Sequence, residues 1–308
     1  MSAALVLPLE GPGGEPVDLP RTLASHGVAT LPPMSIDEKT SSFEVTLPVP
    51  RARPRVVQVR PGQRGTVRIE VLGRAPSART AAALKANVRR ILGLDQDLAP
   101  FYEQVKDDPD LAWAAAGAGR MVRSPTVFEE VVKTICTTNC AWSATVRMTG
   151  ALVEHLGERA AGAPATGVRG RTFPSPAAMA AAGESFYRDV ARAGYRGRYL
   201  MDLAAMVEDG SLDLEELGAA SPEDLPDVEL AQRLQALPGV GPYAAAHIMM
   251  LMGRHSLLVL DSWTRPTYAR LTGKKKASDA AIERRFRRYG PYRGLAFWLF
   301  LTRDWVAE

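Results

Sequence analysis

The segment from Leu234 to Asp261 limits the fold more tightly than any other part of the chain, and it reads LQALPGVGPYAAAHIMMLMGRHSLLVLD. Apolar residues at helical spacing stand on both sides of the turn PGVG at 238–241, which predicts two short helices joined by a hairpin. The two glycines free the backbone to bend sharply and to approach another molecule closely. Because the second helix begins with N–H groups that have no helical partner, its start favours an anion such as a DNA phosphate.

An apolar run at 256–260 ends at Asp261, just before an expected helix that contains Trp263 and Tyr268. A carboxylate that closes such a run is a candidate for chemistry. The alternative is that Asp261 only caps the helix, because Asp is among the preferred residues at a helix start.

The order of LPGVG, a helix and an Asp eighteen residues after Tyr243 resembles the helix-hairpin-helix DNA glycosylase superfamily. In that superfamily the hairpin holds the DNA strand and the Asp is catalytic. The resemblance implies that Gly239, Val240 and Gly241 bind the DNA backbone and that Asp261 carries the chemistry. Ligases, nucleases and polymerases use similar hairpins only to hold DNA, so the hairpin without the Asp would imply no more than binding.

At 308 residues the chain is long enough for two domains, and its net charge of +4 is a mild basic excess that fits a polyanionic partner. The sequence has no run of about eighteen apolar residues and no basic and apolar leader, so we expect neither a membrane span nor secretion. We expect a cytoplasmic, nucleoid-associated protein that acts as a monomer on double-stranded DNA carrying a damaged or mismatched base.

The only cysteines are Cys136 and Cys140. Two thiols cannot supply the four ligands of an iron–sulfur cluster, which the endonuclease III and MutY-like branches of the superfamily usually carry. We therefore expect no metal and no cofactor. Cys136 lies on the apolar side of an expected helix, where a small buried hydrophobe is favoured over a nucleophile.

The N-terminal part shows alternating β-branched residues separated by turns that contain Pro or Gly, which predicts an antiparallel sheet with strands at 43–47, 55–60 and 65–72. Residues 1–17 are rich in Gly and Pro, and we expect a poorly packed lead-in there. Asp18 is expected to start a helix that ends at Gly27. Strand arginines more often face water than bind phosphate, and we favour that interpretation for Arg51, Arg53, Arg55, Arg60, Arg64 and Arg68.

From Thr80 onward the apolar spacing is helical. The expected helices cover 81–92, 98–105, 109–116, 127–138, 143–156 and 200–208, and an acidic solvated stretch covers 209–229. The predicted fold class is α+β. An N-terminal antiparallel sheet domain at 1–79 is followed by a mainly helical glycosylase core at 80–308, which has two subdomains, the hairpin at 234–249 and the active cleft between the subdomains.

The segment 124–157 resembles the corresponding part of the 8-oxoguanine glycosylase and AlkA-type alkyladenine glycosylase branches. In those branches a turn between two helices inserts a residue into the duplex, which implies that Asn139 fills the gap left by a flipped base. The alternative for Asn139 is a helix cap. Trp142 is expected either to stack nearby or to pack in the core. Similar stretches at 193–199 and 289–297 extend the resemblance over residues 80–308.

Tyr243 stands where bifunctional members of the superfamily have a Lys that attacks the sugar as an amine. A phenol with a pKa near ~10 cannot form an imine, so we expect a monofunctional glycosylase. The resemblance then implies that Asp261 stabilises an oxocarbenium-like sugar and activates a water molecule. His247 would replace the amine only if it reached the sugar, and a packed or phosphate-facing His is favoured.

Phe297 stands where the 8-oxoguanine glycosylase presents a Gln to the flipped base, and an aromatic ring cannot read a base edge by hydrogen bonds. Trp142, Tyr243, Trp263 and Phe297 are instead expected to line an aromatic pocket or the duplex wedge. The base stays open among alkylated purines, mismatched uracil or thymine, and oxidised purines. Two other functions compete with this one: a catalytically silent DNA-binding protein, and a bifunctional glycosylase/lyase that uses another amine.

Overall fold

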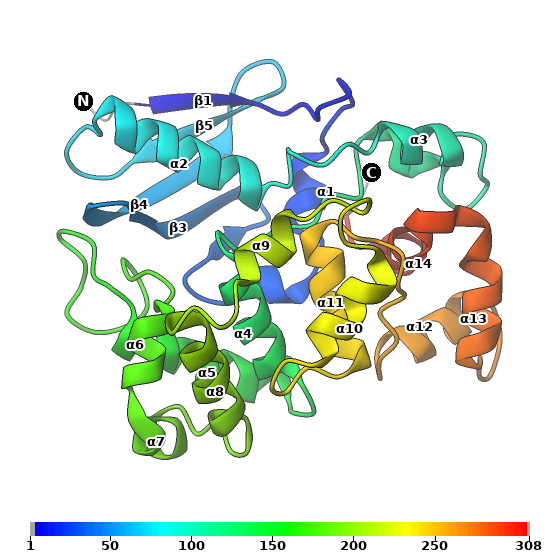
Figure 1. The fold of residues 1–308 in the computed structure, drawn as a ribbon. Coiled ribbons are helices and arrows are strands. Elements are labelled where there is room, and N and C mark those ends of the chain that lie inside the picture. Colours follow the sequence, from blue (N-terminus) through cyan, green and yellow to red (C-terminus); the bar gives the residue numbers. More distant parts are fainter. Residues whose placement is uncertain (1–3, 307–308) are drawn as a thin grey trace.

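The computed structural model describes residues 4–306. Its N-terminal part is a five-stranded antiparallel sheet in the order β1-β5-β4-β3-β2, and the helix α2 (Ala78–Ile91) lies along it (Figure 1). The strands are β1 (Ala4–Pro8), β2 (Ser35–Asp37), β3 (Ser42–Val49), β4 (Ala52–Pro61) and β5 (Thr66–Val71). The rest of the chain is helical, so the predicted class, an antiparallel sheet followed by helices, is confirmed.

The alternation of β-branched residues accounts for the buried face of the sheet. Val57 in β4 pairs with Val45 in β3 and with Val71 in β5, and all three side chains are buried. Leu84 and Val88 of α2 are buried in the same core. Burial of these branched side chains against a helix stabilises both elements, so the core of the sheet extends past the expected boundary at residue 79.

The expectation that residues 1–17 form a poorly packed lead-in is wrong for the described part from residue 4 onward. β1 pairs with β5 in register, with Leu7 buried opposite Val67. Glu15 is also buried. A strand of five residues takes its order from backbone hydrogen bonds to β5, and this long-range pairing leaves no local signal in the sequence.

The helices largely follow the predicted pattern. The helix α1 (Leu19–Leu23) begins at the expected cap, where the Asp18 carboxylate accepts the Arg21 N–H at 2.9 Å, and a 3₁₀ turn η1 (Gly27–Thr30) follows it. The other elements are α3 (Ala99–Val105), η2 (Ala112–Ala116), α4 (Val127–Thr137), α5 (Trp142–Leu156), α6 (Pro176–Ala181), α7 (Gly183–Ser185), η3 (Phe186–Val190), α8 (Arg196–Glu208), α9 (Leu214–Ala219), α10 (Asp227–Gln235), α11 (Pro242–Met252), α12 (Thr264–Leu271), α13 (Asp279–Phe286), η4 (Arg287–Tyr292) and α14 (Arg293–Thr302). Among residues 4–306, no helix has the length and apolar character needed to cross a bilayer.

Two of the expected segments differ from the structure. Residues 109–116 form only the 3₁₀ turn η2, because a short alanine-rich stretch between loops is too brief to propagate an α-helix. The acidic stretch 209–229 is not simply a solvated surface. It contains the helix α9, and Leu214 and Leu225 are buried in the neighbouring core.

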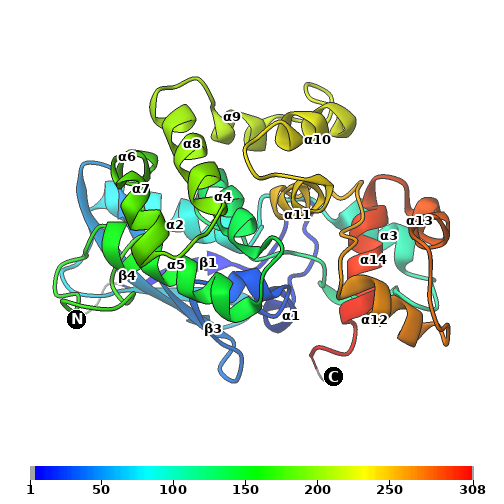
Figure 2. The ribbon, with the colours of Figure 1, turned by 90° about the horizontal axis from the view of Figure 1, so that it is seen from below.

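The helix α11 joins two helical cores. Ala245, Ile248 and Met249 face one core together with residues of α4, α8 and α10, whereas Ala246 and Met250 face a second core with α3 and α14. A helix that is apolar on every side must be buried on every side. Figure 2 shows α11 between these two groups of helices.

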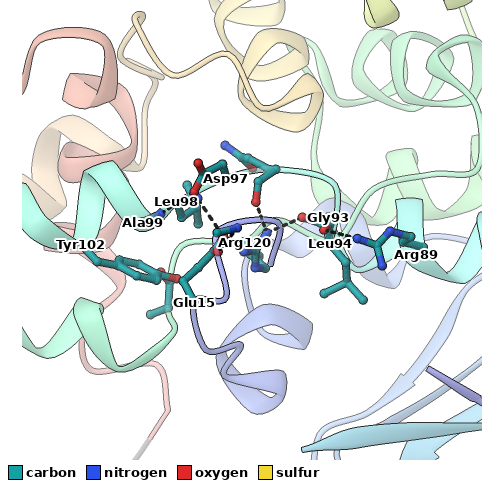
Figure 3. A network of polar contacts seen from close by, with 12 residues as sticks. Glu15, Arg89, Gly93, Leu94, Asp97, Leu98, Ala99, Tyr102 and Arg120 are labelled. Atoms are coloured by element: carbon teal, nitrogen blue, oxygen red, sulfur yellow. Dashed lines mark hydrogen bonds and ion pairs between the residues drawn. The ribbon is translucent and has the colours of Figure 1, made fainter. Parts of the chain in front are cut away.

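A buried ion pair fixes the connector at 117–125 to the N-terminal segment. The Arg120 guanidinium has no exposed surface and donates to the Glu15 carboxylate, to the Gly93 carbonyl and, at 2.6 Å, to the Gln96 carbonyl (Figure 3). Glu15 also accepts the Leu98 N–H at 2.9 Å. Burial pushes the pKa of Glu15 upward, but the Leu98 N–H and Arg120 outweigh it, so the pKa lies below its usual value and Glu15 is ionised.

Three of the four histidines are buried and neutral. Burial lowers the pKa of His26 to about 4, and the pKa values of His247 and His255 to about 3. Glu130 in α4 behaves in the opposite way, because burial raises its pKa to about 7 while the Ser124 N–H donates to its carboxyl group. These four groups make the free energy of unfolding depend on pH.

We expect Glu15→Gln to lower the free energy of unfolding by about 3 kcal/mol or more, because Arg120 would remain charged and buried without a counter-ion. Urea unfolding at neutral pH measures the change. The matched control is Glu103→Gln, which breaks the exposed Glu103–Lys106 pair (2.8 Å) and should cost less than about 1 kcal/mol. Equal effects of the two substitutions would contradict a structural role for the buried pair.

Acidification from pH 7 to pH 5 should destabilise the protein. Each buried histidine stays neutral in the folded protein but gains a proton in the unfolded chain, which lowers the free energy of unfolding by about 2 kcal/mol per histidine at pH 5.

Glu130 opposes this loss of stability. Its pKa is raised in the folded protein, so its contribution to the free energy of unfolding grows as the pH falls from 7 toward 4.5. Glu130→Gln, which keeps an acceptor for Ser124, should therefore make the acid loss steeper. Parallel curves of unfolding free energy against pH would contradict a raised pKa at Glu130.

Candidate active site

The turn between α10 and α11 requires glycine at residue 239. Gly239 has φ = +77°, in the left-handed region that L side chains rarely adopt. A Cβ atom there would also lie 2.8 Å from Cδ2 of Tyr199. Backbone conformation and the Tyr199 ring therefore exclude any larger residue.

Gly241 has a different role in the same turn. It is the N-cap of α11, it is exposed, and its φ of −95° is open to any residue. A Cβ atom at Gly241 would meet nothing within 4 Å, so the glycine leaves space in front of the helix. Within residues 4–306 the N–H groups of Gly241, Tyr243 and Ala244 donate to no other atom, whereas the N–H of the buried Val240 donates to Leu237 at 3.2 Å. An anion fits the free N–H groups.

Asp261 caps α12 and still has one free carboxylate oxygen. Its Oδ1 accepts the N–H groups of Trp263 (2.8 Å) and Thr264 (2.6 Å), and its own N–H donates to the Thr264 hydroxyl at 2.8 Å. Asp261 therefore binds the N–H groups at the start of α12, as the capping alternative expects, although the N-cap residue of this helix is Trp263. Oδ2 has no hydrogen-bond partner within residues 4–306, and the capping bonds hold it in a fixed direction.

Tyr243 lies near the Asp261 carboxylate. Burial raises the pKa of the Tyr243 phenol and the charge of Asp261 raises it further, while a contact with the Thr137 hydroxyl lowers it. The phenol is therefore neutral. Beneath it lies His247, whose ring stacks on Tyr243 with centroids 6.1 Å apart and whose Nδ1 lies 3.3 Å from the Thr134 hydroxyl. His247 is packed in the interior, which is the interpretation that the sequence favoured.

Three tryptophans form an aromatic cluster that begins at the residue bonded to Asp261. The ring centroids of Trp263, Trp298 and Trp305 lie between 5.5 and 6.1 Å from one another. Trp263 and Trp305 are about two-fifths exposed, whereas Trp298 is buried and its Nε1 donates to the Ser25 carbonyl at 2.8 Å. Sequence reasoning missed Trp298 and Trp305, although Trp298 follows directly after Phe297.

The expectation that Phe297 lines the base pocket is wrong. Phe297 has no exposed surface, and its ring packs against Phe286 (5.2 Å between centroids) and Tyr268 (6.3 Å). Successive residues on an α-helix point about 100° apart, so Phe297 faces α12 and α13 while its neighbour Trp298 faces the tryptophan cluster.

Asn139 and Trp142 lie on an exposed turn between α4 and α5. Asn139 has φ = +47° and its side chain caps no helix, since the N-cap residue of α5 is Ala141 and no side-chain hydrogen bond caps that helix. The guanidinium of Arg196 holds the turn by donating to the carbonyls of Thr138 and, at 2.9 Å, Asn139. Trp142 is 46% exposed, so it does not pack in the core.

The exposed tyrosines Tyr195 and Tyr199 connect this turn to the hairpin. Their ring centroids lie 5.9 Å apart, and Tyr199 contacts the backbone position of Gly239. The AGYRGRY stretch was noted in the sequence, but no site role was assigned to its tyrosines. The structure thus brings Asp261, Tyr243 and Trp263 together. It places Asn139 and Trp142 on a neighbouring turn and removes Phe297.

Within residues 4–306, no three His, Cys, Asp or Glu side chains gather closely enough to hold a metal ion. Cys136 is buried, and burial raises its pKa to about 12, as suits a packed hydrophobe. The prediction that Cys136 belongs to the core is confirmed.

We expect Gly239→Ala and Gly241→Ala to separate the two glycine roles. Gly239→Ala should lower the free energy of unfolding by about 2 kcal/mol or more, through the left-handed backbone and the contact with Tyr199. Gly241→Ala should cost less than about 1 kcal/mol, because its backbone conformation and surroundings accept a methyl group. Chemical unfolding of both variants decides this, and equal losses would contradict the assignment.

No family model and no curated protein sequence matches the chain. Solved structures match it at low identity. The 3-methyladenine DNA glycosylase from Archaeoglobus fulgidus superposes with a TM-score of 0.72 at 19% identity, over 99% of this chain and 100% of that one. The Clostridium acetobutylicum 8-oxoguanine glycosylase/lyase gives 0.71 in its apo-form, at 19% identity over 98% and 97% of the two chains.

The same clostridial enzyme bound to double-stranded DNA that contains cytosine opposite 8-oxoguanine gives a TM-score of 0.68, at 19% identity over 99% of this chain and 98% of that one. Each match extends over the N-terminal sheet as well as the helices. The chain therefore has the fold of the helix-hairpin-helix DNA glycosylases over nearly its whole length.

Proposed function

We propose that this protein is a monofunctional DNA N-glycosylase that acts as a monomer on a damaged base in duplex DNA. The observation that carries the proposal is the position of Asp261. Two backbone N–H groups hold one of its carboxylate oxygens, the other oxygen has no hydrogen-bond partner within residues 4–306, and the carboxylate is near enough for its charge to raise the pKa of the Tyr243 phenol. Tyr243 is the second residue of the helix whose N–H groups are ready for a phosphate.

In the proposed reaction the bond between the sugar C1′ and the base nitrogen breaks, and the base leaves with the bonding electrons. The sugar becomes oxocarbenium-like, and the negative charge of Asp261 stabilises it. A water molecule then attacks C1′ and gives its proton to the free carboxylate oxygen. The products are the free base and an abasic site. The capping hydrogen bonds keep the carboxylate oriented throughout.

Among residues 4–306, the side chains of Tyr243, His247 and Lys133 support monofunctional chemistry. The neutral phenol of Tyr243 cannot form an imine, and His247 is buried beneath it. Lys133 in α4 is buried as well, and its ammonium is paired with Glu129 at 2.6 Å. None of these groups presents a free amine to a sugar held near Asp261.

The tryptophan cluster supports an alkylated purine as the base. Stacking and cation–π interactions with the faces of Trp263 and Trp305 would stabilise a cationic, electron-poor base. Such a base is also a good leaving group and needs no specific hydrogen bonds from the protein. A neutral base such as 8-oxoguanine needs specific hydrogen bonds from the protein. The position that would provide them is occupied by Phe297, which is apolar and buried. One structural neighbour is a 3-methyladenine DNA glycosylase, which agrees with this substrate class.

The exposed turn between α4 and α5 is proposed to fill the duplex when the base flips out. Asn139 is exposed and its amide is free to hydrogen-bond the opposite base, while Trp142 offers a stacking surface. Gly239, Val240 and Gly241 form the hairpin turn that is proposed to hold the strand, and the free N–H groups that would bind the phosphate are those of Gly241, Tyr243 and Ala244.

We expect Asp261→Asn to abolish excision while the fold remains intact. Asn keeps an oxygen that accepts the Trp263 and Thr264 N–H groups, so the cap survives and only the charge is lost. Single-turnover rates should fall at least ~10³-fold. The assay uses duplexes carrying alkylated purines, hypoxanthine, uracil, thymine opposite guanine, or 8-oxoguanine, scored for abasic sites with and without alkali.

The control is Asp279→Asn, which removes an exposed carboxylate paired with Arg265 at 2.7 Å and should leave excision unchanged. Strand breaks without alkali, together with borohydride trapping, would contradict the monofunctional mechanism. Tight DNA binding by wild type and Asp261→Asn without excision of any base would indicate a catalytically silent binder.

A further inference from the structure

A hollow of about 420 Å³ lies between the sheet and the loop at 160–170. One wall comes from β4 and from the chain after β5, and the other comes from the loop. The lining residues include three arginines, Arg55, Arg74 and Arg169, and no carboxylate. The lining therefore differs from the chain as a whole, in which 38 basic residues accompany 34 acidic ones.

Two of the three guanidinium charges in the hollow are not neutralised. Arg55 donates to the Arg74 carbonyl at 2.7 Å, and the Arg74 side chain has no bond to any residue of 4–306. Arg169 is different, because it pairs with Glu44 at 2.9 Å. A carbonyl satisfies hydrogen bonds but leaves the positive charge in place, so Arg55 and Arg74 together present two uncompensated charges.

Arginine side chains hold the shape of the loop that forms the opposite wall. Arg171 donates to the carbonyls of Gly157 (3.3 Å), Ala165 (3.0 Å) and Gly167 (3.1 Å). Arg159 donates to a loop carbonyl in the same way. These two guanidinium groups hold the loop in shape through carbonyls alone, so they add positive charge to the side of the molecule that carries the hollow.

Both walls also carry apolar side chains. Pro54, Val56 and Leu72 lie on the wall from the sheet and Pro164 lies on the loop, and Leu72 is 38% exposed. An apolar surface beside two guanidinium groups fits a sugar-phosphate unit, with the sugar on the apolar wall and the phosphate on the planar guanidinium fork.

We propose that this hollow between β4 and the 160–170 loop binds a backbone phosphate of duplex DNA at a distance from the lesion. The proposal rests on the proposed function, which brings DNA to the hairpin. The phosphate belongs either to the flanking arm of the same duplex or to a second duplex. Arg55 and Arg74 thus form a second DNA-holding site in the sheet domain, where strand arginines were expected only to face water.

The test compares the double variant Arg55→Gln/Arg74→Gln with wild type by fluorescence anisotropy on two duplexes. A duplex of about 12 base pairs reaches about 20 Å on each side of the lesion, whereas about 40 base pairs exceeds the length of the protein. For the long duplex, the slope of log affinity against log salt should decrease by about one in the variant, because one phosphate contact is lost. Affinity for the short duplex and its single-turnover excision rate should not change.

The control is Arg284→Gln/Arg287→Gln, which removes the same charge from α13 and η4, at the other end of the molecule from the sheet (Figure 1). Arg74→Gln alone should show about half of the decrease in salt slope that the double variant shows. Its thermal unfolding should not change, because the Arg74 side chain makes no hydrogen bond within residues 4–306. Stoichiometry separates the two sources of phosphate. A flanking arm gives one duplex per protein, whereas a second duplex gives protein-dependent bridging of two short duplexes that the double variant loses.

Long-duplex affinities and salt slopes that match those of the α13 control would overturn the proposal. Its failure is distinct from failure of the proposed function. A wild-type protein that excises no base but loses long-duplex affinity in the double variant would refute the glycosylase and keep the second DNA site.

Discussion

The buried ion pair between Glu15 and Arg120 determines how the sheet and the helices are placed relative to each other. Glu15 belongs to the segment after β1, Arg120 to the connector before α4, and the remaining guanidinium bonds reach the loop after α2 (Figure 3). Next to Arg120, Gly119 packs against Leu295 and Leu299 of α14. One fully desolvated charge thus aligns α4 and α14, and a buried charge tolerates little displacement from its partners. α4 leads to the Asn139 turn and α14 carries Trp298, so the geometry of the candidate site depends on this pair.

At Asp261, capping and the proposed chemistry use different oxygens of one carboxylate. Oδ1 accepts two N–H groups at the start of α12, and these hydrogen bonds fix the orientation of Oδ2. A carboxylate on a flexible loop would need to be ordered during each reaction, whereas this one is ordered by folding. The two interpretations that the sequence left open, helix cap and chemical group, are therefore compatible.

The sequence predicted what depends on local pattern. The hairpin, the sheet strands β3 to β5, α1 and most of the long helices follow from glycine turns, alternation and helical spacing. The roles of Asp261 and Tyr243 are implied by the family resemblance and stay predictions. The strand β1 and the Glu15–Arg120 pair could not be predicted, because their partners lie far away in the sequence and pairing leaves no periodic trace. The hollow beside Arg55 could not be predicted from the sequence for the same reason, because the loop at 160–170 lies beside β4 only in the folded chain.

Trp298, and not the predicted Phe297, faces the tryptophan cluster. This difference shows that aligning a helix residue by residue with that of a related family predicts side-chain positions less well than aligning a turn. Neighbouring helical residues point in very different directions, so a small rotation of α14 decides which side chain enters the pocket. Here the indole N–H of Trp298 bonds to the Ser25 carbonyl, directly after α1, and this bond turns Trp298 toward the tryptophan cluster and Phe297 into the core. The N-terminal segment therefore helps to shape the proposed base pocket. A pocket built in this way depends on how the segment at Ser25 packs against α14 as much as on the sequence of the helix itself.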